Sequence, residues 1–367
     1  AALLCAFFFC DPARRTTTSG SDDGQIEIVF LQINDVYEIS PLSDNSGGLA
    51  RVAALRKSLL EKNPNTFTVL AGDFISPSVI GTLKFEGKRI RGRQMVDVLN
   101  TLGLDWTVFG NHEFDYDYED MQARLNESKF TWFAANARHV TATGATQPFV
   151  KKRPDGTEEK CPDYVIAEVK DADGTVVKLG VFGVLVTTGQ KPFVTYTEPL
   201  AEAKRAHAEL LGKTDIRIGL THLDVADDLK LAAMLPDVPL IMGGHDHDNM
   251  FLKVGRTHVA KADANARTVY VHTLRHNKKT GVTMVKSELR RIDASLQPDP
   301  ATAAVVDKWE KIKSESLSSA GFDATKKVTD LKEPLDCREA AVRHSQVPVG
   351  QMIVNAMLSV AKNKPEC

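Results

Sequence analysis

The sequence predicts an α/β fold in which two β-sheets pack together and helices cover them from outside. Between residues 26 and 242, apolar runs rich in β-formers alternate with segments of helical periodicity. After residue 244 the apolar runs continue without helical segments between them, which is typical of antiparallel strands. The composition agrees with this class, because 43% hydrophobic and 26% charged residues are usual for a globular chain.

The predicted elements follow in order along the chain. The first strand covers residues 26–33, and the helix after it covers 48–60, where Leu49, Val52 and Ala53 share one face. Further helices are expected at 93–102 and 200–211. Asp173-Gly174 is a hairpin signal between two of the strands. The remaining strands are expected at 66–70, 106–109, 130–134, 164–169, 176–186, 216–220, 240–242, 251–260, 268–274 and 282–292.

The two ends of the chain differ from this central part. Residues 1–24 are interpreted as a leader: an apolar run too short to span a bilayer, typical either of a signal-peptide remnant or of a non-native extension, followed by a flexible lead-in. Residues 25–300 form the expected main domain, and 301–335 a helix and polar linker. In residues 336–367, apolar side chains recur at helical spacing from Val349 to Val360, which predicts an amphipathic helix opening a second, truncated domain.

The charge balance excludes some classes of partner. The chain has 46 Lys and Arg against 48 Asp and Glu, a formal net charge of -2. This balance gives no electrostatic reason to expect a nucleic acid polymer or an anionic membrane as the main partner. No stretch reaches transmembrane length, and the five scattered cysteines lack the spacing of a disulfide scaffold or a zinc ribbon.

Polar side chains follow five of the predicted strands at the point where each strand ends. They are Asp35, Asp73, the pair Asn111 and His112, His222, and the pair His245 and His247. In open α/β sheets, ligands bind at the carboxyl ends of the strands. Glycines at 72, 110, 243 and 244 lie beside these side chains and let the backbone approach a ligand closely. A binding site is therefore expected at this edge.

The donor set at this edge predicts a metal centre. Two carboxylates, one amide oxygen and three imidazoles suit Zn, Mn, Fe, Ni or Co better than Ca, which prefers oxygen ligands alone. Six donors exceed the need of one catalytic zinc, so two divalent transition-metal ions about 3.5–4 Å apart are expected. Asp73, which arrives centrally, is the best candidate for a carboxylate that bridges both ions.

The order of these blocks resembles the calcineurin-like metallophosphoesterases. Gly110-Asn111-His112-Glu113-Phe114-Asp115 is similar to the branch that contains 5′-nucleotidases, UDP-sugar hydrolases and cyclic phosphodiesterases. The resemblance covers residues 25–292 and implies a four-layer αββα sandwich of two mixed sheets flanked by helices. The segments around Val349-Gly350-Gln351 and Asn355-Ala356-Met357 resemble the opening of that branch's C-terminal domain, which holds the nucleoside.

The resemblance also implies a role for each site residue. It places Asp35, Asp73 and His247 on the first metal. It places Asp73, Asn111, His222 and His245 on the second. His112 and Asp115 become a catalytic dyad, and Asn111 and His112 also contact substrate. In this scheme a metal-activated water attacks the phosphorus, and His112, oriented by Asp115, stabilises the phosphate oxygens or protonates the leaving alkoxide.

One residue departs from the family pattern. The first block usually contains Asp-x-His, whereas this chain has Asp35-Val36-Tyr37. Tyr37 could be a phenolate ligand of a ferric ion, a hydrogen-bond donor behind the ligands, or a packed side chain. The last two are favoured, because a neutral phenol is a poor ligand for Zn or Mn. Either one predicts a weaker first metal site.

The expected function is therefore removal of phosphate from nucleotides, in the manner of a 5′-nucleotidase. Cyclic nucleotides or UDP-sugars are alternative substrates within the same family. The alternative from another class is a non-catalytic nucleotide-binding or sensor module, and only Tyr37 favours it. The apolar leader favours export from the cytoplasm, with a cytoplasmic location as the alternative.

Overall fold

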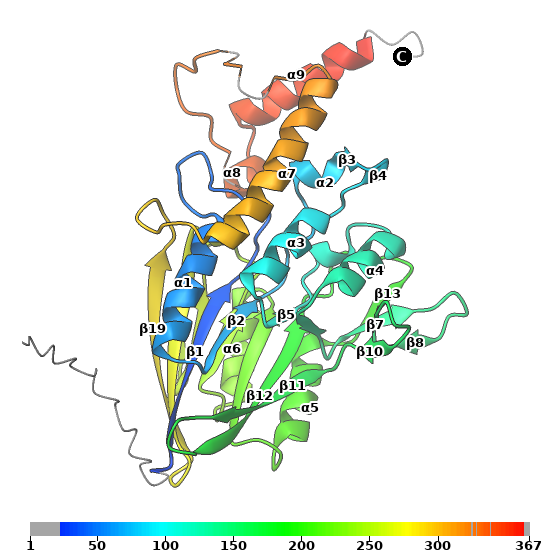
Figure 1. The fold of residues 1–367 in the computed structure, drawn as a ribbon. Helices are drawn as coiled ribbons and strands as arrows, with labels where there is room; N and C mark the ends of the chain where they lie inside the picture. Colours follow the sequence, from blue (N-terminus) through cyan, green and yellow to red (C-terminus); the bar gives the residue numbers. More distant parts are fainter. Residues whose placement is uncertain (1–22, 324–325, 328, 338, 363–367) are drawn as a thin grey trace, which may run out of the picture. The chain divides into compact units, whose positions relative to one another are not determined.

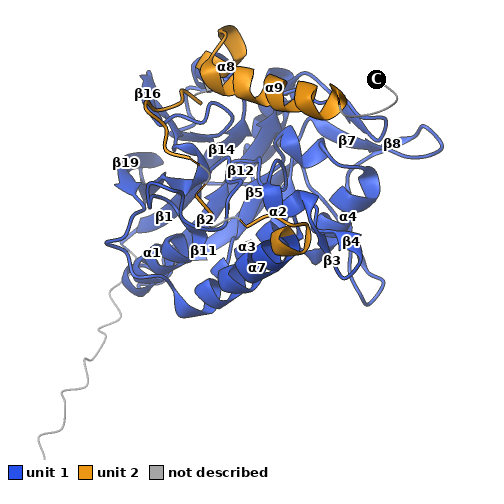
Figure 2. Cartoon of the chain, turned by 90° about the horizontal axis from the view of Figure 1, so that it is seen from above, with its two compact units in different colours: residues 1–316 blue, residues 317–367 orange. Residues whose placement is uncertain are grey.

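The structure is a computed structural model that describes residues 23–323, 326–327, 329–337 and 339–362. Contacts divide the chain into two compact units, residues 1–316 and 317–367, coloured separately in Figure 2. Residues 1–22 of the expected leader lie outside the described residues. None of the described helices is long and apolar enough to cross a membrane.

The first unit contains two six-stranded sheets (Figure 1). The first sheet has the order β19-β18-β1-β2-β5-β6. Its strands β1 (Gln25–Ile33), β2 (Thr66–Leu70), β5 (Trp106–Val108) and β6 (Thr131–Phe133) run parallel. Strands β18 (Thr268–Asn277) and β19 (Val282–Arg291) are antiparallel additions at the β1 side. The first strand of the chain therefore pairs with one of the last, with Gln25 opposite Asn277.

The second sheet has the order β11-β12-β14-β15-β17-β16. Its four central strands β12 (Val176–Leu185), β14 (Ile216–His222), β15 (Leu240–Gly243) and β17 (Thr257–Lys261) run parallel. The outer strands β11 (Tyr164–Lys170) and β16 (Met250–Val254) are antiparallel to their neighbours. The hairpin expected at Asp173-Gly174 joins β11 to β12, and Gly174 has a φ of 98°.

Helices cover the outer faces of both sheets. Apolar side chains of α1 (Leu49–Lys62), α3 (Arg93–Leu102) and α4 (Tyr118–Glu127) join the core that lies between and around the sheets. Those of α5 (Pro199–Leu210) and α6 (Val225–Met234) form a second cluster with β12 and β15. Helix α7 (Pro300–Ser319) adds to the first layer, since the buried Trp309 indole donates to Asp97 of α3 at 2.9 Å. The αββα sandwich expected from the sequence is confirmed.

Short elements occupy the connections. They are α2 (Val79–Thr82), β3 (Lys84–Phe85), β4 (Lys88–Arg89), the 3₁₀ turns His112–Phe114 and Ala264–Ala266, β7 (Ala137–Val140), β8 (Thr146–Gln147), β9 (Val150–Lys152), β10 (Glu158–Lys160) and β13 (Val194–Tyr196).

The structure corrects three expectations. The strand predicted at 251–260 is two strands, because Gly255, with a φ of 58°, turns the chain between β16 and β17. The strands after residue 244 are not one antiparallel run, since β17 is parallel to β15 and β18 returns to the first sheet. Within the segment 301–335, the polar run of residues 314–335 was expected to be the linker, but it begins inside α7, which continues to Ser319.

The described residues of the second unit include the helices α8 (Glu339–His344) and α9 (Pro348–Lys362). Helix α9 confirms the amphipathic helix predicted at 349–360. None of its described residues is buried, and Met352, Ile353 and Met357 are each more than half exposed.

Candidate dimetal centre

The candidate site lies where the carboxyl edges of the two sheets meet. The Gln32 side chain of β1 donates to the backbone oxygens of Gly243 and Ala260 in the second sheet, at 3.0 Å each. Nearer the site, a ring nitrogen of His222 on β14 lies 2.7 Å from the Ala71 backbone oxygen after β2. These bonds hold the two strand edges together, so side chains from both sheets converge.

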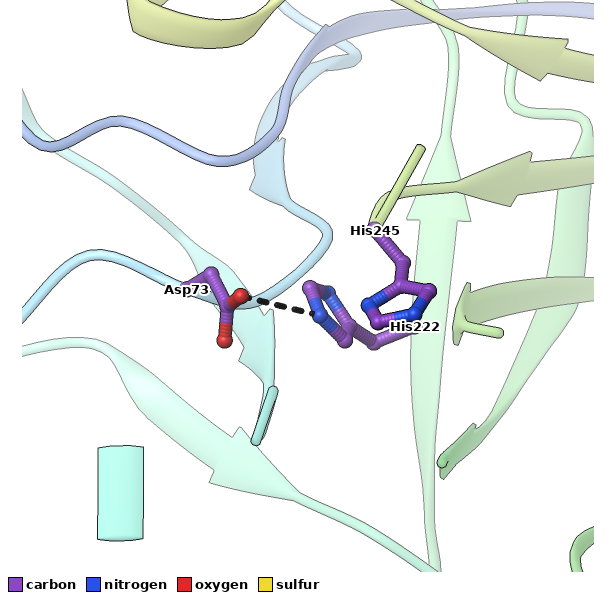
Figure 3. A group of neighbouring side chains, drawn as sticks. All are labelled: Asp73, His222 and His245. Atoms are coloured by element: carbon purple, nitrogen blue, oxygen red, sulfur yellow. Dashed lines mark ion pairs between the residues drawn. The ribbon is translucent and has the colours of Figure 1, made fainter. Parts of the chain in front are cut away.

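Two groups of metal-ligating side chains form there, and they share Asp73. The first is Asp35, Asp73 and His247; the second is Asp73, His222 and His245. In each group the ligand atoms all lie within 4.8 Å of one another. Figure 3 shows the second group, in which an Asp73 carboxylate oxygen lies 3.2 Å from Nε2 of His222. The amide oxygen of Asn111 lies 3.2 Å from the same nitrogen, so all six expected ligands are brought to this edge.

The donors of the first group fit a cation. Oδ2 of Asp35 accepts hydrogen bonds from the Asn34 side chain at 2.8 Å and from the His245 backbone at 2.9 Å. Oδ1 of Asp35 is buried, has no hydrogen-bond partner, and lies 3.5 Å from Nε2 of His247. An unpaired carboxylate oxygen is costly to bury unless a cation compensates it. The donor set therefore suits a metal ion at this point.

The charge around His222 points to a cation in the second group as well. Burial lowers the pKa of His222, but the carboxylates of Asp73 and Asp35 outweigh burial and raise it to about 10. A buried position between carboxylates that favours a proton also favours a metal ion. If Nδ1 carries the hydrogen donated to Ala71, Nε2 remains as the metal-facing nitrogen.

Four of the candidate ligands have a strained backbone. The φ angles of Asp35, Asp73, His245 and His247 are 52°, 60°, 82° and 64°. This left-handed region is unfavourable for residues other than glycine, at roughly 1–3 kcal/mol each, and such residues gather at functional sites. The side chains of these four residues all belong to the two ligand groups.

Glycines give the site its compactness. A Cβ on Gly110 would lie 2.1 Å from Oδ1 of Asp73, and one on Gly244 would lie 2.2 Å from the Ala71 backbone oxygen. Neither position has room for any side chain. The sequence predicted that these glycines let the backbone approach a ligand. In the structure Gly110 makes room for the Asp73 side chain of the same sheet, and Gly244 for the Ala71 backbone of the opposite sheet.

His112 and Asp115 form a pair beside Asp73. Nδ1 of His112 lies 2.7 Å from Oδ2 of Asp115, and Ser76 donates to the same oxygen at 2.8 Å. The hydrogen bond to Asp115 is the main cause that raises the pKa of His112 to about 9, with a further contribution from Asp73. Nε2 of His112 lies 4.0 Å from Oδ2 of Asp73, the residue shared by the two ligand groups. The His112 side chain is about one-third exposed, so the ring faces Asp73 from the solvent-accessible side.

Comparison with known proteins agrees with this arrangement. The family model described as calcineurin-like phosphoesterase matches residues 28–249. The chain belongs to the calcineurin-like phosphoesterase family. It is 26% identical over 272 residues to a snake venom 5′-nucleotidase of Gloydius brevicauda, covering 69% of this chain and 41% of that protein. It is 25% identical over 374 residues to the trifunctional nucleotide phosphoesterase protein YfkN of Bacillus subtilis, covering 93% of this chain and 24% of that protein.

The chain thus spans less than half the length of these curated relatives. Among solved structures, a 5′-nucleotidase precursor from Thermus thermophilus matches with a TM-score of 0.72 and 21% identity, covering 92% of this chain and 68% of that one. This likeness supports the calcineurin-like phosphoesterase fold.

Glu113 is a residue of this phosphoesterase site that sequence analysis missed. Its buried carboxylate accepts backbone N–H groups of Asp73 and Phe74 at 2.9 Å, Ile75 at 3.3 Å and Gly110 at 2.6 Å. Burial, and then the charge of Asp73, raise the pKa of Glu113 to about 7. Glu113 therefore ties the Asp73 loop to the Gly110 loop. The only sequence signal was its place between His112 and Phe114.

Lys261 was also missed, and it supports the segment that carries His245 and His247. Its side chain is completely buried. The ammonium group pairs with Asp228 at 2.8 Å and with Asp246, and donates to the backbone oxygens of Leu223 and Gly244 at 2.5 and 2.8 Å. Burial acts to lower the pKa of Lys261, but the two carboxylates outweigh it and raise that pKa. A lone Lys at the end of an apolar strand gave no sign of this role.

Tyr37 lies at the edge of the first ligand group of this phosphoesterase. Its hydroxyl donates to Oδ2 of Asp73 at 3.2 Å and lies 3.1 Å from Nε2 of His247. Burial is the main cause that raises the pKa of Tyr37, and the nearby Asp73 and Asp35 raise it further. In this environment the phenol keeps its proton, which favours the hydrogen-bond donor among the three interpretations.

Proposed function

We propose that this protein is a dimetal-dependent phosphohydrolase that removes phosphate from nucleotides. The observation that carries the proposal is the pair of ligand groups joined by Asp73, with the His112–Asp115 dyad directly beside them. The names of the relatives, a 5′-nucleotidase and a nucleotide phosphoesterase, support nucleotides as the substrate class.

Each side chain has a defined task in this proposal. Asp35, Asp73 and His247 would hold the first ion, and Asp73, Asn111, His222 and His245 would hold the second. Bound divalent transition metals supply Lewis-acid charge and make water acidic enough to act as the nucleophile. His112 carries the proton or positive charge presented to the phosphoryl group, and Asn111 contacts the substrate beside it. Asp115 fixes the ring of His112 through Nδ1.

The dyad separates this proposal from a non-catalytic binding module. A module that only binds nucleotides has no need of an imidazole held by a carboxylate, with Ser76 and Lys191 in turn bonded to Asp115. Cyclic nucleotides and UDP-sugars remain alternative substrates of the same chemistry.

A phosphate-release assay tests the proposal. Purified protein is stripped with a chelator, divided, and supplied with Mn²⁺, Co²⁺, Zn²⁺ or no metal, and AMP is the substrate. We expect phosphate release only in the metal-supplied samples. Release of equal amounts without metal, or none under any condition, would contradict the proposed function.

Metal stoichiometry gives a second prediction, because Tyr37 stands where the family usually has a ligand. Metal-replete protein should carry up to two ions per chain, and the ion on the Tyr37 side should be lost first on dialysis. Tyr37→His should retain both ions, whereas the matched variant Tyr37→Phe should lose the first ion as readily as the native chain. Elemental analysis after dialysis measures this. Two firmly held ions in the native chain would show that the first site is not weak.

The raised pKa of His112 predicts an alkaline limit on activity. The protonated ring persists up to about pH 9, so kcat/KM should fall as the pH rises through that value. Asp115→Asn removes the main cause of the raised pKa, and the fall should then begin at a lower pH. Profiles of kcat/KM against pH for both proteins provide the measurement. If the alkaline fall of kcat/KM occurs at the same pH in Asp115→Asn, a group other than His112 causes it.

Two further features belong to the proposal. We propose that residues 25–300 are the catalytic domain and that residues 336–367 belong to a domain that holds the nucleoside. Export from the cytoplasm is proposed on the apolar leader.

A further inference from the structure

A cavity of about 970 Å³ lies beside the candidate metal centre. The segment between β12 and α5 forms most of its wall, and the beginning of α6 closes it with Leu223, Asp224 and Asp227. Neither the metal ligands nor the dyad are among its lining residues, so it is a space beside them. Its volume is at the upper end of the range for small-molecule pockets, roughly 300–1,000 Å³.

The walls of this cavity are joined to the reacting groups. Lys191, which lines it, donates from Nζ to the backbone oxygen of Asp115 at 3.0 Å. On the α6 side, Oδ1 of Asp224 lies 3.5 Å from Nε2 of His245. The cavity therefore lies between the dyad on one side and the second ligand group on the other. Both contacts link residues that line the cavity to groups of the candidate site.

We propose that this cavity receives the leaving-group half of the substrate and selects a neutral, hydroxyl-rich alcohol such as a ribose or hexose over an anionic one. This inference rests on the proposed function, since it assigns the substrate class of the same site. It places recognition of the part of the alcohol next to the scissile ester in the catalytic unit, and leaves the remainder of a nucleoside to the domain proposed for residues 336–367.

The lining chemistry supports a hydroxyl-rich group. Thr187, Thr188, Thr195, Thr197 and Gln190 are among the residues that line the cavity. Hydroxyls and amides both donate and accept hydrogen bonds, as sugar hydroxyls require. Val186, Val194 and Leu223 supply apolar surface between them. This mixture matches the alternating polar and apolar faces of a sugar ring.

The charges of the lining disfavour an anion. Glu198, Asp224 and Asp227 line the cavity, and Lys191 is the one cation among the lining residues that the structure describes. Glu198 caps α5 through the backbone N–H groups of Leu200 and Ala201, and Asp227 pairs with Lys230 at 2.8 Å. Asp224 has a side chain 64% exposed and faces the site beside His245. Its two oxygens can accept bonds from adjacent hydroxyls and repel a second negative charge.

Two substrates of similar size test the charge preference. Hydrolysis of glycerol 3-phosphate releases glycerol, a neutral alcohol. Hydrolysis of 3-phosphoglycerate releases glycerate, an alcohol that carries a carboxylate. We expect the native protein to prefer glycerol 3-phosphate in kcat/KM by about tenfold. Asp224→Asn should bring this ratio close to one. The matched variant Asp227→Asn should leave it near the native value, because Asp227 is already paired. The ratio compares two substrates on one protein, so differences in metal content between variants cancel.

A second pair of variants tests occupancy of the cavity. Thr188→Trp introduces a bulky ring at an exposed lining position and should lower kcat/KM for ribose 5-phosphate about tenfold. Competitive inhibition by inorganic phosphate should be unchanged. Thr101→Trp, on the exposed face of α3, is the control and should change neither value.

The outcomes separate this inference from the proposed function. The cavity assignment is overturned by a native ratio near one. It is also overturned if Asp224→Asn leaves the native ratio intact and Thr188→Trp behaves like the native protein. Phosphate release from AMP in the same preparation would then leave the proposed function standing. Failure to release phosphate from any of these esters overturns both.

Discussion

Replacing His112 with alanine should lower phosphate release by roughly 10²–10⁴-fold, the usual contribution of a positioned acid or base. The ring is held by Asp115 at 2.7 Å and is not a member of either group of candidate metal ligands. Metal content should therefore remain close to that of the native protein. Steady-state kinetics with AMP and elemental analysis of the same sample give the two values.

The control for this variant is His344→Ala, which removes an exposed histidine in the second unit. It should retain native activity and metal content. If His112→Ala loses metal together with activity, His112 is a ligand and the assignment of the dyad is wrong. If it keeps native activity, proton transfer or charge stabilisation comes from another group.

Replacing Lys261 with methionine should lower the free energy of unfolding by about 3–5 kcal/mol, the range for removing one partner of a buried ion pair. The substitution leaves the carboxylates of Asp228 and Asp246 without their common cation, and leaves the backbone oxygens of Leu223 and Gly244 without a donor. Chemical denaturation of metal-free protein measures the effect without a contribution from bound ions. Lys286→Met, at an exposed position of β19, is the control and should stay within about 0.5 kcal/mol of the native protein.

The same variant tests what Lys261 holds in place. Asp246 lies between His245 and His247, both of which have left-handed backbone conformations. If the buried ammonium stabilises that conformation, Lys261→Met should also bind metal more weakly than Lys286→Met does. Native stability in Lys261→Met would show that the buried pair contributes little to the fold.

Sequence patterns located the strands and the ligands because both depend on local features. A strand such as β2 is an apolar run, and it ends at residue 70, directly before the Gly72-Asp73 step. Position at a strand end explains why Asp35 and Asp73 lie together, since parallel strands of one sheet end at a common edge. His222 joins them because the edge of the second sheet meets that of the first, which no local pattern showed. Long helices with a clear apolar face, such as α3, were predicted with correct bounds.

Other features depend on contacts between distant residues and left no local pattern. Glu113 and Lys261 act on backbone groups far away in the chain, so their residue types alone did not distinguish them from solvated charges. The sequence did not show the turn at Gly255, because apolar residues occur in both of the strands that flank it, β16 and β17. The left-handed conformations of His245 and His247 are imposed by tertiary contacts and not by residue preference.

The division of the ligands between two sheets determines when the site can exist during synthesis. Asp35 and His245, which bond to each other, are 210 residues apart in sequence. At translation rates of roughly 5–20 residues per second, His245 is synthesised on the order of 10–40 seconds after Asp35. The first sheet is completed later still, because β1 pairs with β18. Metal loading is therefore expected only after His245 has been made, and the ions acquired should be those present where the chain folds, whatever the intrinsic order of metal affinities.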